Sequence, residues 1–241
     1  MMICVARDPG LTEPRMTPEP TNVRSWVEPM FKAIFAALTL FGLAACTVQA
    51  TAPASGAAAG VEVTNRVIES PTSVYMPPEL ASLSQKIEVA GVACGAYSFP
   101  TSIGPGLAET IRLTNKAALK NEVPGGTAAG PPNGAEYNIA FALESIEASV
   151  SFPATGGIFF PGYLVATLAR AEVRLQVHVI SRKNGEVVRT VVEGLGASNM
   201  KQGFPNTCED GSKALSEAFG MAFRNLAKDY IDRVINSGAF H

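Results

Sequence analysis

The segment from Ala169 to Ile180 is the most regular stretch of the sequence. Small and aliphatic residues occupy the odd positions, and polar residues occupy the even ones. Alternation with a period of two predicts a β-strand with one buried face and one face open to water. The Asn184-Gly185 pair that follows predicts a tight hairpin, so 186–193 should return as an antiparallel partner. The open face of the strand would carry Arg170, Glu172, Arg174 and Gln176.

A second long strand is expected between Glu136 and Val150. Its aliphatic residues lie at odd positions up to Leu143 and at even positions from Ile146 onward. A strand changes face in this way only if it contains an extra residue, so we predict a β-bulge at Glu144-Ser145. Alternation also predicts a strand at 86–94 and a possible first strand at 61–68.

Two segments have the spacing of amphipathic helices, Leu107–Asn121 and Ser212–Ile235. In each, apolar residues recur three or four positions apart, with charged residues between them. We therefore expect a single α+β domain over residues 61–241, in which an antiparallel sheet has two helices packed on one face. Segments rich in Gly and Pro should be irregular, and these are 70–85, 95–106, 122–135 and 194–206.

The N-terminal part contains a short apolar run, from Ala33 to Ala45, that follows Lys32. A run of about 13 residues is shorter than the roughly 20 that span a bilayer, and it is typical of a cleaved export signal. It ends in Leu43-Ala44-Ala45-Cys46, which resembles the lipobox of bacterial lipoproteins. The resemblance implies cleavage before Cys46 and lipidation of that cysteine. An ordinary secretory signal cut after Ala45 is the alternative.

This resemblance sets the organisation of the first 60 residues. Residues 1–29 contain five prolines and mixed charges, unlike the basic start of a signal, and we interpret them as an upstream extension foreign to the native protein. Residues 30–45 would be the signal peptide, and 46–60 the lipidated cysteine and a flexible tether of small residues. In Gram-negative lipoproteins, Asp after the cysteine favours the inner membrane. Thr47 therefore implies the periplasmic face of the outer membrane.

Two further cysteines, Cys94 and Cys208, lie within the expected domain. An oxidising compartment favours a disulfide between them, and two separate buried thiols are the alternative. Neither cysteine belongs to a CxxC or CxH pattern, so we expect no metal site and no cofactor. The formal net charge of −2 argues against a nucleic-acid partner.

Catalytic motifs are absent from the sequence. His178 has no GxSxG elbow to accompany it, and it is more simply a solvated strand residue. Glu144 and Glu147 could form an acid–base pair for glycan hydrolysis. Carboxylates on a strand surface are, however, usually solvated charges. We therefore expect no catalytic residue.

The segment from Phe152 to Tyr163 combines aromatic residues with Gly and Pro. Exposed apolar side chains often mark a contact with a partner or a membrane. We predict a partner-binding loop that carries Ile158, Phe159, Phe160 and Tyr163. In the alternative interpretation these residues fold back and cover one end of the core.

The sequence thus favours a non-enzymatic envelope lipoprotein. A lipid on Cys46 would hold the domain at the membrane, where it would bind a protein or an amphiphile in assembly, transport or scaffolding. The element order loosely resembles small outer-membrane assembly lipoproteins, such as the one that plugs the lipopolysaccharide translocon, without a shared motif. The alternatives are a lipid-anchored hydrolase of cell-wall glycan and a structural lipoprotein without a specific ligand.

Overall fold

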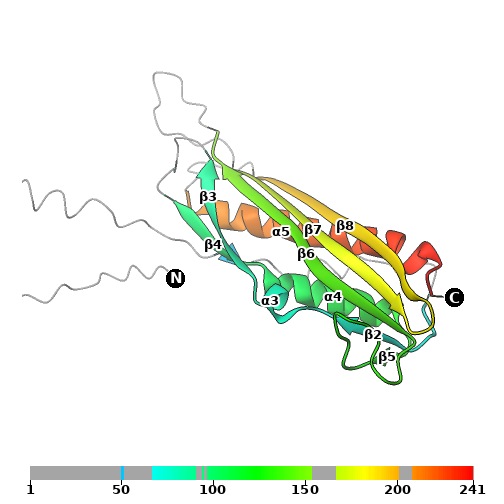
Figure 1. Cartoon of the computed structure of the whole chain (residues 1–241). Coiled ribbons are helices and arrows are strands. Elements are labelled where there is room, and N and C mark those ends of the chain that lie inside the picture. Colours follow the sequence, from blue (N-terminus) through cyan, green and yellow to red (C-terminus); the bar gives the residue numbers. More distant parts are fainter. Residues whose placement is uncertain are drawn as a thin grey trace, which may run out of the picture. The chain divides into compact units, whose positions relative to one another are not determined.

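The structure is a computed structural model that describes residues 50–51, 67–90, 94, 97–153, 167–200 and 208–240. All of them belong to a compact unit that runs from Thr47 to His241. Its class is α+β, as predicted (Figure 1). In chain order the elements are β1 (Ala50–Thr51), β2 (Thr72–Tyr75), α3 (Pro78–Ala81), β3 (Ser84–Ala90), β4 (Ser98–Ser102), α4 (Gly104–Ala118), β5 (Glu122–Val123), β6 (Tyr137–Ser151), β7 (Thr167–Ser181), β8 (Gly185–Met200), α5 (Asp210–Arg233) and the 3-10 turn η1 (Ile235–Ser237).

Strands β6, β7 and β8 form the antiparallel meander that the alternating pattern predicted. Gly185 has a φ of 74° at the hairpin between β7 and β8, a conformation that glycine adopts without strain. The register of β6 against β7 shifts between Leu143 and Ser145. The predicted bulge is therefore confirmed, and it lets both halves of β6 turn their aliphatic residues toward the helices.

The prediction of a purely antiparallel sheet was wrong, because the sheet is mixed. β2 and β3 both run parallel to β6, and β1 runs parallel to β4. β2 and β3 lie on the same edge of β6 and are separated by the single turn of α3. The chain therefore passes twice along β6 in the same direction, which alternation within one strand cannot reveal.

All four segments that were expected to be irregular contain strand residues, and in 122–135 these are the two residues of β5. β2 and α3 lie within 70–85, β4 lies within 95–106, and β8 extends into 194–206 as far as Met200. Pro78 stands at the start of α3, a position where a missing N–H has no consequence for the helix. The prediction of a strand at 61–68 falls largely outside the described residues, and Ile68 makes a single bridge to Leu119.

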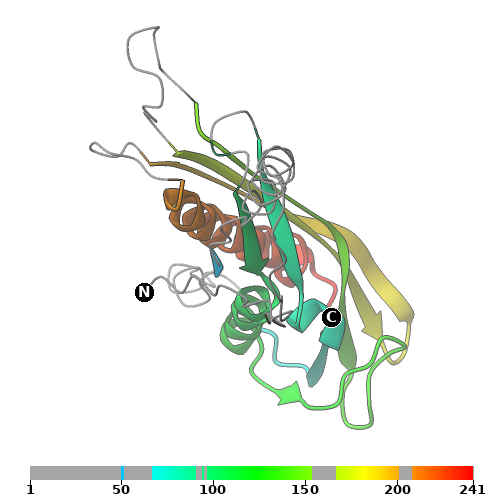
Figure 2. The ribbon, with the colours of Figure 1, turned by 90° about the vertical axis from the view of Figure 1, so that its left-hand side faces the viewer.

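Helix α5 packs on the inner face of β7 and β8, where the sheet curls around it (Figure 2). Two glycines of β8 permit this close approach. A Cβ at Gly196 would lie 1.9 Å from the carbonyl oxygen of Ala218, and one at Gly194 would lie 2.1 Å from that of Ala222. The Gly194-Leu195-Gly196 segment therefore lies within strand β8, and its two glycines pack against helix α5.

Helix α4 lies beside α5 and is joined to it by a buried hydrogen bond. The Tyr230 hydroxyl donates to Asn115 Oδ1 over 2.7 Å. Burial raises the pKa of the Tyr230 hydroxyl far above its usual range, with a smaller effect from Glu122. The hydroxyl therefore remains a donor throughout the ordinary pH range.

Strand β1 places two residues of the expected tether in the sheet. Ala50 pairs with Thr101 of β4, and its side chain is 1% exposed within the hydrophobic core. The stretch 46–60 is therefore not a free tether over its whole length. A fixed point of the domain follows closely after Cys46.

Candidate functional site

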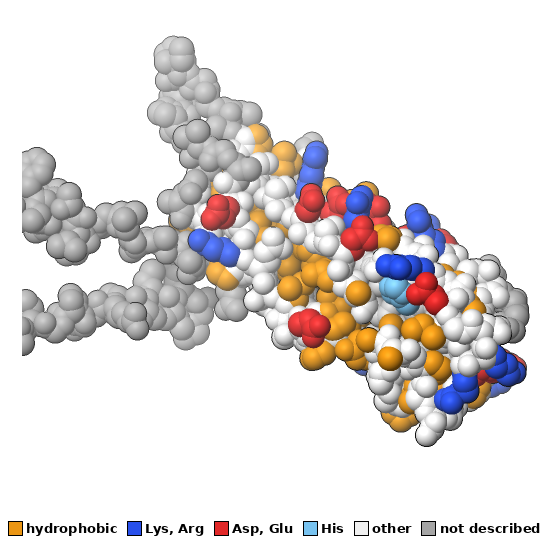
Figure 3. Space-filling view, viewed as in Figure 1, with side chains coloured by type: hydrophobic (Ala, Val, Ile, Leu, Met, Phe, Trp, Pro, Cys, Tyr) orange, Lys and Arg blue, Asp and Glu red, His pale blue; other side chains and the backbone are white. Residues whose placement is uncertain are grey.

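The outer face of the β6–β7–β8 meander, which points away from α5, carries the polar side chains that the sequence placed there. Arg174 lies between two carboxylates, 2.7 Å from Glu172 and 3.4 Å from Glu193. Glu193 first and Glu172 second hold the pKa of Arg174 above its ordinary value. Figure 3 shows charged side chains along β7 and β8. This face thus carries a network of ion pairs between oppositely charged side chains.

His178 belongs to the same network. Its Nδ1 lies 2.7 Å from Glu186 Oε2. In the amide orientation that satisfies its neighbours, Gln176 donates to His178 Nε2 over 3.2 Å and accepts from Arg189. Both ring nitrogens are therefore engaged, and the geometry gives His178 a structural role on the strand surface.

A depression of about 560 Å³ lies on the outer face near the Met200 end of β8. Pairing brings Glu147, Glu172 and Leu195 into one row across the three strands. Leu195 is 54% exposed, so the row combines two carboxylates with a bare aliphatic side chain. The lining residues are Glu147, Ala148, Ser149, Arg170, Ala171, Glu172, Leu195, Gly196 and Ala197.

The sequence analysis missed Leu195, because Gly194 and Gly196 on either side of it suggested a loop. The signal that could have found it is the continued alternation of β8. Val192, Gly194 and Gly196 fall on the face turned to α5, and Leu195 falls on the other. Glycine at inward positions indicates a close helix contact as readily as a turn.

Glu144 and Glu147 are both exposed, Glu144 at the bulge and Glu147 in the depression. The nearest cross-strand carboxylate to Glu147 is Glu172, which is already paired with Arg174. A general acid in glycan hydrolysis needs a carboxyl group shielded from water. The open surface supplies no such shielding, so this arrangement does not support acid–base chemistry.

The free edge of β6 is a second candidate surface. Within the described part of the chain, β2 pairs with 137–140 and β3 with 150–151, and no strand pairs with the stretch between them. Leu143 on this stretch is 43% exposed, and Figure 3 shows hydrophobic atoms between β6 and α3. By contrast, α5 covers the edge of β8, where Asn225 donates to the Leu195 carbonyl and Asp229 accepts from the Glu193 N–H.

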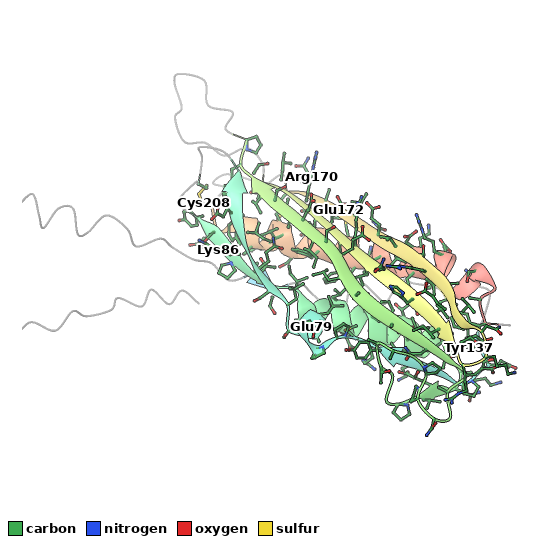
Figure 4. The ribbon with its side chains drawn as sticks, in the orientation of Figure 1. Glu79, Lys86, Tyr137, Arg170, Glu172 and Cys208 are labelled. Carbon is green, nitrogen blue, oxygen red and sulfur yellow. A yellow bond between two sulfur atoms is a disulfide. The ribbon has the colours of Figure 1, made fainter. Side chains whose placement is uncertain are left out.

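The predicted disulfide between Cys94 and Cys208 is confirmed. It joins the region between β3 and β4 to the chain just before α5. Nearby, Gly211 at the start of α5 lies against Phe99 of β4 and Phe152 at the end of β6. The disulfide therefore closes the end of the domain at which β6 finishes and α5 begins (Figure 4).

The other predicted site residues lie outside the described residues. These are Cys46 and the loop residues Ile158, Phe159, Phe160 and Tyr163. Across the described ranges, no helix is both long and apolar enough to cross a bilayer. Those ranges also contain no group of three or more His, Cys, Asp or Glu side chains that could hold a metal ion.

No protein-family model matches the sequence, and no curated protein matches it. Several solved structures show a distant likeness, and they include the following three. A Xanthomonas campestris protein of the family model DUF330 is 10% identical, with a TM-score of 0.45 over 80% of this chain and 96% of that one. A minor lipoprotein from Acinetobacter baumannii is 10% identical, with a TM-score of 0.36 over 71% and 94%.

The third is a candidate lipoprotein from Caulobacter crescentus CB15, which is 12% identical, with a TM-score of 0.32 over 66% of this chain and 92% of that one. Likeness at this level assigns neither a family nor a function to this chain.

Proposed function

We propose that this protein is a lipid-anchored protein of the bacterial envelope, without catalytic activity, that binds a protein or an amphiphile. Its role would be in envelope assembly, transport or scaffolding, at the periplasmic face of the outer membrane. The observation that carries the proposal is the Cys94–Cys208 disulfide. Disulfides persist in oxidising compartments, and Leu43-Ala44-Ala45-Cys46 resembles the end of a signal that would direct the chain to one.

The segment with Ile158, Phe159, Phe160 and Tyr163 is proposed as the binding element. It connects β6 to β7, and pairing of Ser151 with Leu168 places both of its ends at the same end of the sheet. A connection of this length between two neighbouring strands has no need of bulky apolar residues for closure. Their presence supports a contact with a partner.

The lipid anchor is tested by acyl labelling and fractionation of cells that express the full chain. Labelled fatty acid should enter the native protein and not a Cys46→Ser variant, and only the native protein should resist carbonate extraction from membranes. A Thr47→Asp variant is the matched control for location, because it should keep the label and shift to the inner membrane. Labelling that persists without Cys46 would contradict the proposal.

Partner binding is tested by photo-crosslinking in native membranes. A photoreactive residue replaces Phe159 or Phe160, and a matched one replaces Lys183, which is exposed at the hairpin between β7 and β8. One dominant adduct at 159 or 160, absent at 183 and lost with Cys46→Ser, is the expected result. Intramolecular adducts alone would show that the aromatic residues cover the core.

A further inference from the structure

Strand β1 fixes the chain to the domain almost immediately after Cys46. Its two residues pair in parallel with Thr101 and Ser102 of β4. Ala50 is part of the buried core, and only residues 47–49 separate it from Cys46. The link between the proposed anchor and the folded domain is therefore far shorter than the stretch 46–60.

The length of this link limits where the anchor can be. Four residue steps from Ala50 to Cys46 span at most about 14 Å, at roughly 3.6 Å per residue. Strand β6 has 15 residues, which corresponds to about 50 Å. An acylated Cys46 can therefore reach only a fraction of the length of the domain.

The strand register shows which fraction this is. Thr101, the β4 partner of Ala50, also pairs with Gln85 of β3. Val89 lies four residues further along β3, and it pairs with Val150 of β6. At about 3.3 Å per residue, Ala50 lies about 13 Å from the level of Val150 and about 30 Å from the level of Tyr137. The link can reach the first level and falls short of the second. We call the first the disulfide end, formed by residues 148–153, 167–169, 197–200 and 97–102 with Cys94–Cys208.

The direction of β1 agrees with this assignment. Because β1 and β4 are parallel, Ala50 is the end of β1 that is directed toward the side where β4 begins, at Ser98. Ser98 pairs with Glu88, close to the end of β3. Figure 4 places Cys208 and Tyr137 at opposite ends of the long strands. A link that continues the direction of β1 would bring the anchor to the end that bears Cys208.

Both ends of the domain carry charged side chains. Residues 148–153, 167–169, 197–200 and 97–102 include no Asp, Glu, Lys or Arg. Arg170, opposite Ser149 and Ala197, and the exposed Lys86–Glu88 pair of β3, opposite Pro100 and Ser98, nevertheless lie at this end. The opposite end carries ion pairs of Lys183 with Glu136 (3.7 Å) and Lys120 with Glu69 (2.9 Å). At the disulfide end, the buried Asp210 is paired with Lys213. Charge therefore does not distinguish the two ends, and the assignment rests on the length and the direction of the link.

We propose that the disulfide end contacts the lipid headgroup surface of the membrane in which Cys46 is anchored. Strands β6, β7 and β8 then extend away from that surface, and the Tyr137 end projects furthest from it. This inference rests on the proposed lipid anchor and adds the orientation that the anchor imposes. The ligand of this end is a phospholipid surface.

The orientation is tested with the full lipidated chain in vesicles of phosphatidylethanolamine and phosphatidylglycerol that contain a nitroxide-headgroup lipid. A fluorophore is attached through an unnatural amino acid at Pro153 or at Lys183, which are exposed at the two ends. We expect quenching at 153 to exceed quenching at 183 several-fold. Equal quenching, or stronger quenching at 183, would overturn the orientation.

Two spacer insertions make the test specific to the short link. A Gly/Ser spacer of about 15 residues after Thr47 lengthens the link and should lower quenching at 153 toward the value at 183. The same spacer after Ser55 lies beyond β1 and should leave quenching unchanged. Identical effects of the two spacers would also overturn the inference.

Failure of the anchor itself gives a different result. A chain that does not float with the vesicles, and whose Cys46 has no acyl mass, removes both the proposed function and this inference. A chain that floats and is acylated, but is quenched more strongly at 183, contradicts the orientation and leaves the anchor intact.

Discussion

A buried hydroxyl and a buried amide connect the two long helices. Tyr230 of α5 donates to Asn115 of α4, and Asn115 Nδ2 has no hydrogen-bond partner among the described residues. We predict that Tyr230→Phe destabilises the domain by about 1–3 kcal/mol, because Asn115 Oδ1 then also loses its partner inside the core. Denaturant unfolding monitored by far-UV circular dichroism measures the change in midpoint.

The matched control replaces both polar groups. In the double variant Asn115→Leu, Tyr230→Phe no buried polar atom is left unpaired at this contact, so its stability should exceed that of Tyr230→Phe alone. A double variant that is less stable than the single one would show that packing, and not the hydrogen bond, sets the energy of this contact.

At the scale of single residues, the sequence was informative where one residue breaks a pattern. The change of parity around Glu144 predicted a bulge that the register of β6 contains. The same reasoning failed at Gly194 and Gly196, because a glycine gives no sign of whether it serves a turn or a close contact. Only the position of Ala218 and Ala222 on α5 decides between these possibilities.

The packing of one element on another depends on such close contacts, and the packing of α5 on β8 is the clearest case. We predict that Gly196→Val lowers stability by about 1–3 kcal/mol, because the new side chain displaces the backbone of α5 at Ala218. Ala197→Val is the control, since Ala197 is exposed on the outer face of the same strand. Thermal unfolding of both variants compares them, and equal midpoints would show that α5 can shift without loss.

The disulfide is the second constraint between elements. Cys94 and Cys208 are separated by 114 positions, and closure of so long a loop contributes on the order of 4–5 kcal/mol in the chain-entropy model. We predict that the variant Cys94→Ser, Cys208→Ser loses stability of this order. Reductant should lower the unfolding midpoint of the native domain and leave that of the variant unchanged. A native midpoint insensitive to reductant would contradict the prediction.

Long elements were predictable and short ones were not. α4, α5 and the β6–β7–β8 meander each contain enough residues for a period of 3.6 or 2 to show. β1, β2, β4 and β5 have between two and five residues, too few for any period. Their parallel pairing also arises from chain crossings that no local pattern encodes, and for this reason the mixed sheet was not expected.

For the molecule as a whole, the proposed anchor and the short link together would make anchoring and folding interdependent. The candidate surfaces were predictable only in part, because the outer face of β7 follows from alternation but its depression requires Leu195 from β8. The proposed orientation at the membrane could not be derived from the sequence at all. It depends on Ala50, a small residue in a segment of small residues, being paired with β4.

If the proposed orientation holds, release of β1 from β4 should allow the domain to reorient at the membrane while the anchor on Cys46 remains. We predict that Ala50→Glu expels β1, because a carboxylate cannot be buried without a partner where Ala50 is 1% exposed. The link from Cys46 would then extend to Val67, a span of up to about 70 Å. Headgroup quenching at Pro153 should fall as it does with the spacer after Thr47, while vesicle binding persists.

The control for this variant is Ala129→Glu, which adds the same charge at an exposed alanine between β5 and β6. It should leave both quenching and the unfolding midpoint unchanged. If Ala50→Glu lowered the midpoint while quenching at Pro153 stayed high, contacts of the disulfide end with lipid would hold the orientation without help from β1. If the variant lost quenching at Pro153 and kept its unfolding midpoint, β1 would set the orientation of the domain at the membrane and contribute little to its stability.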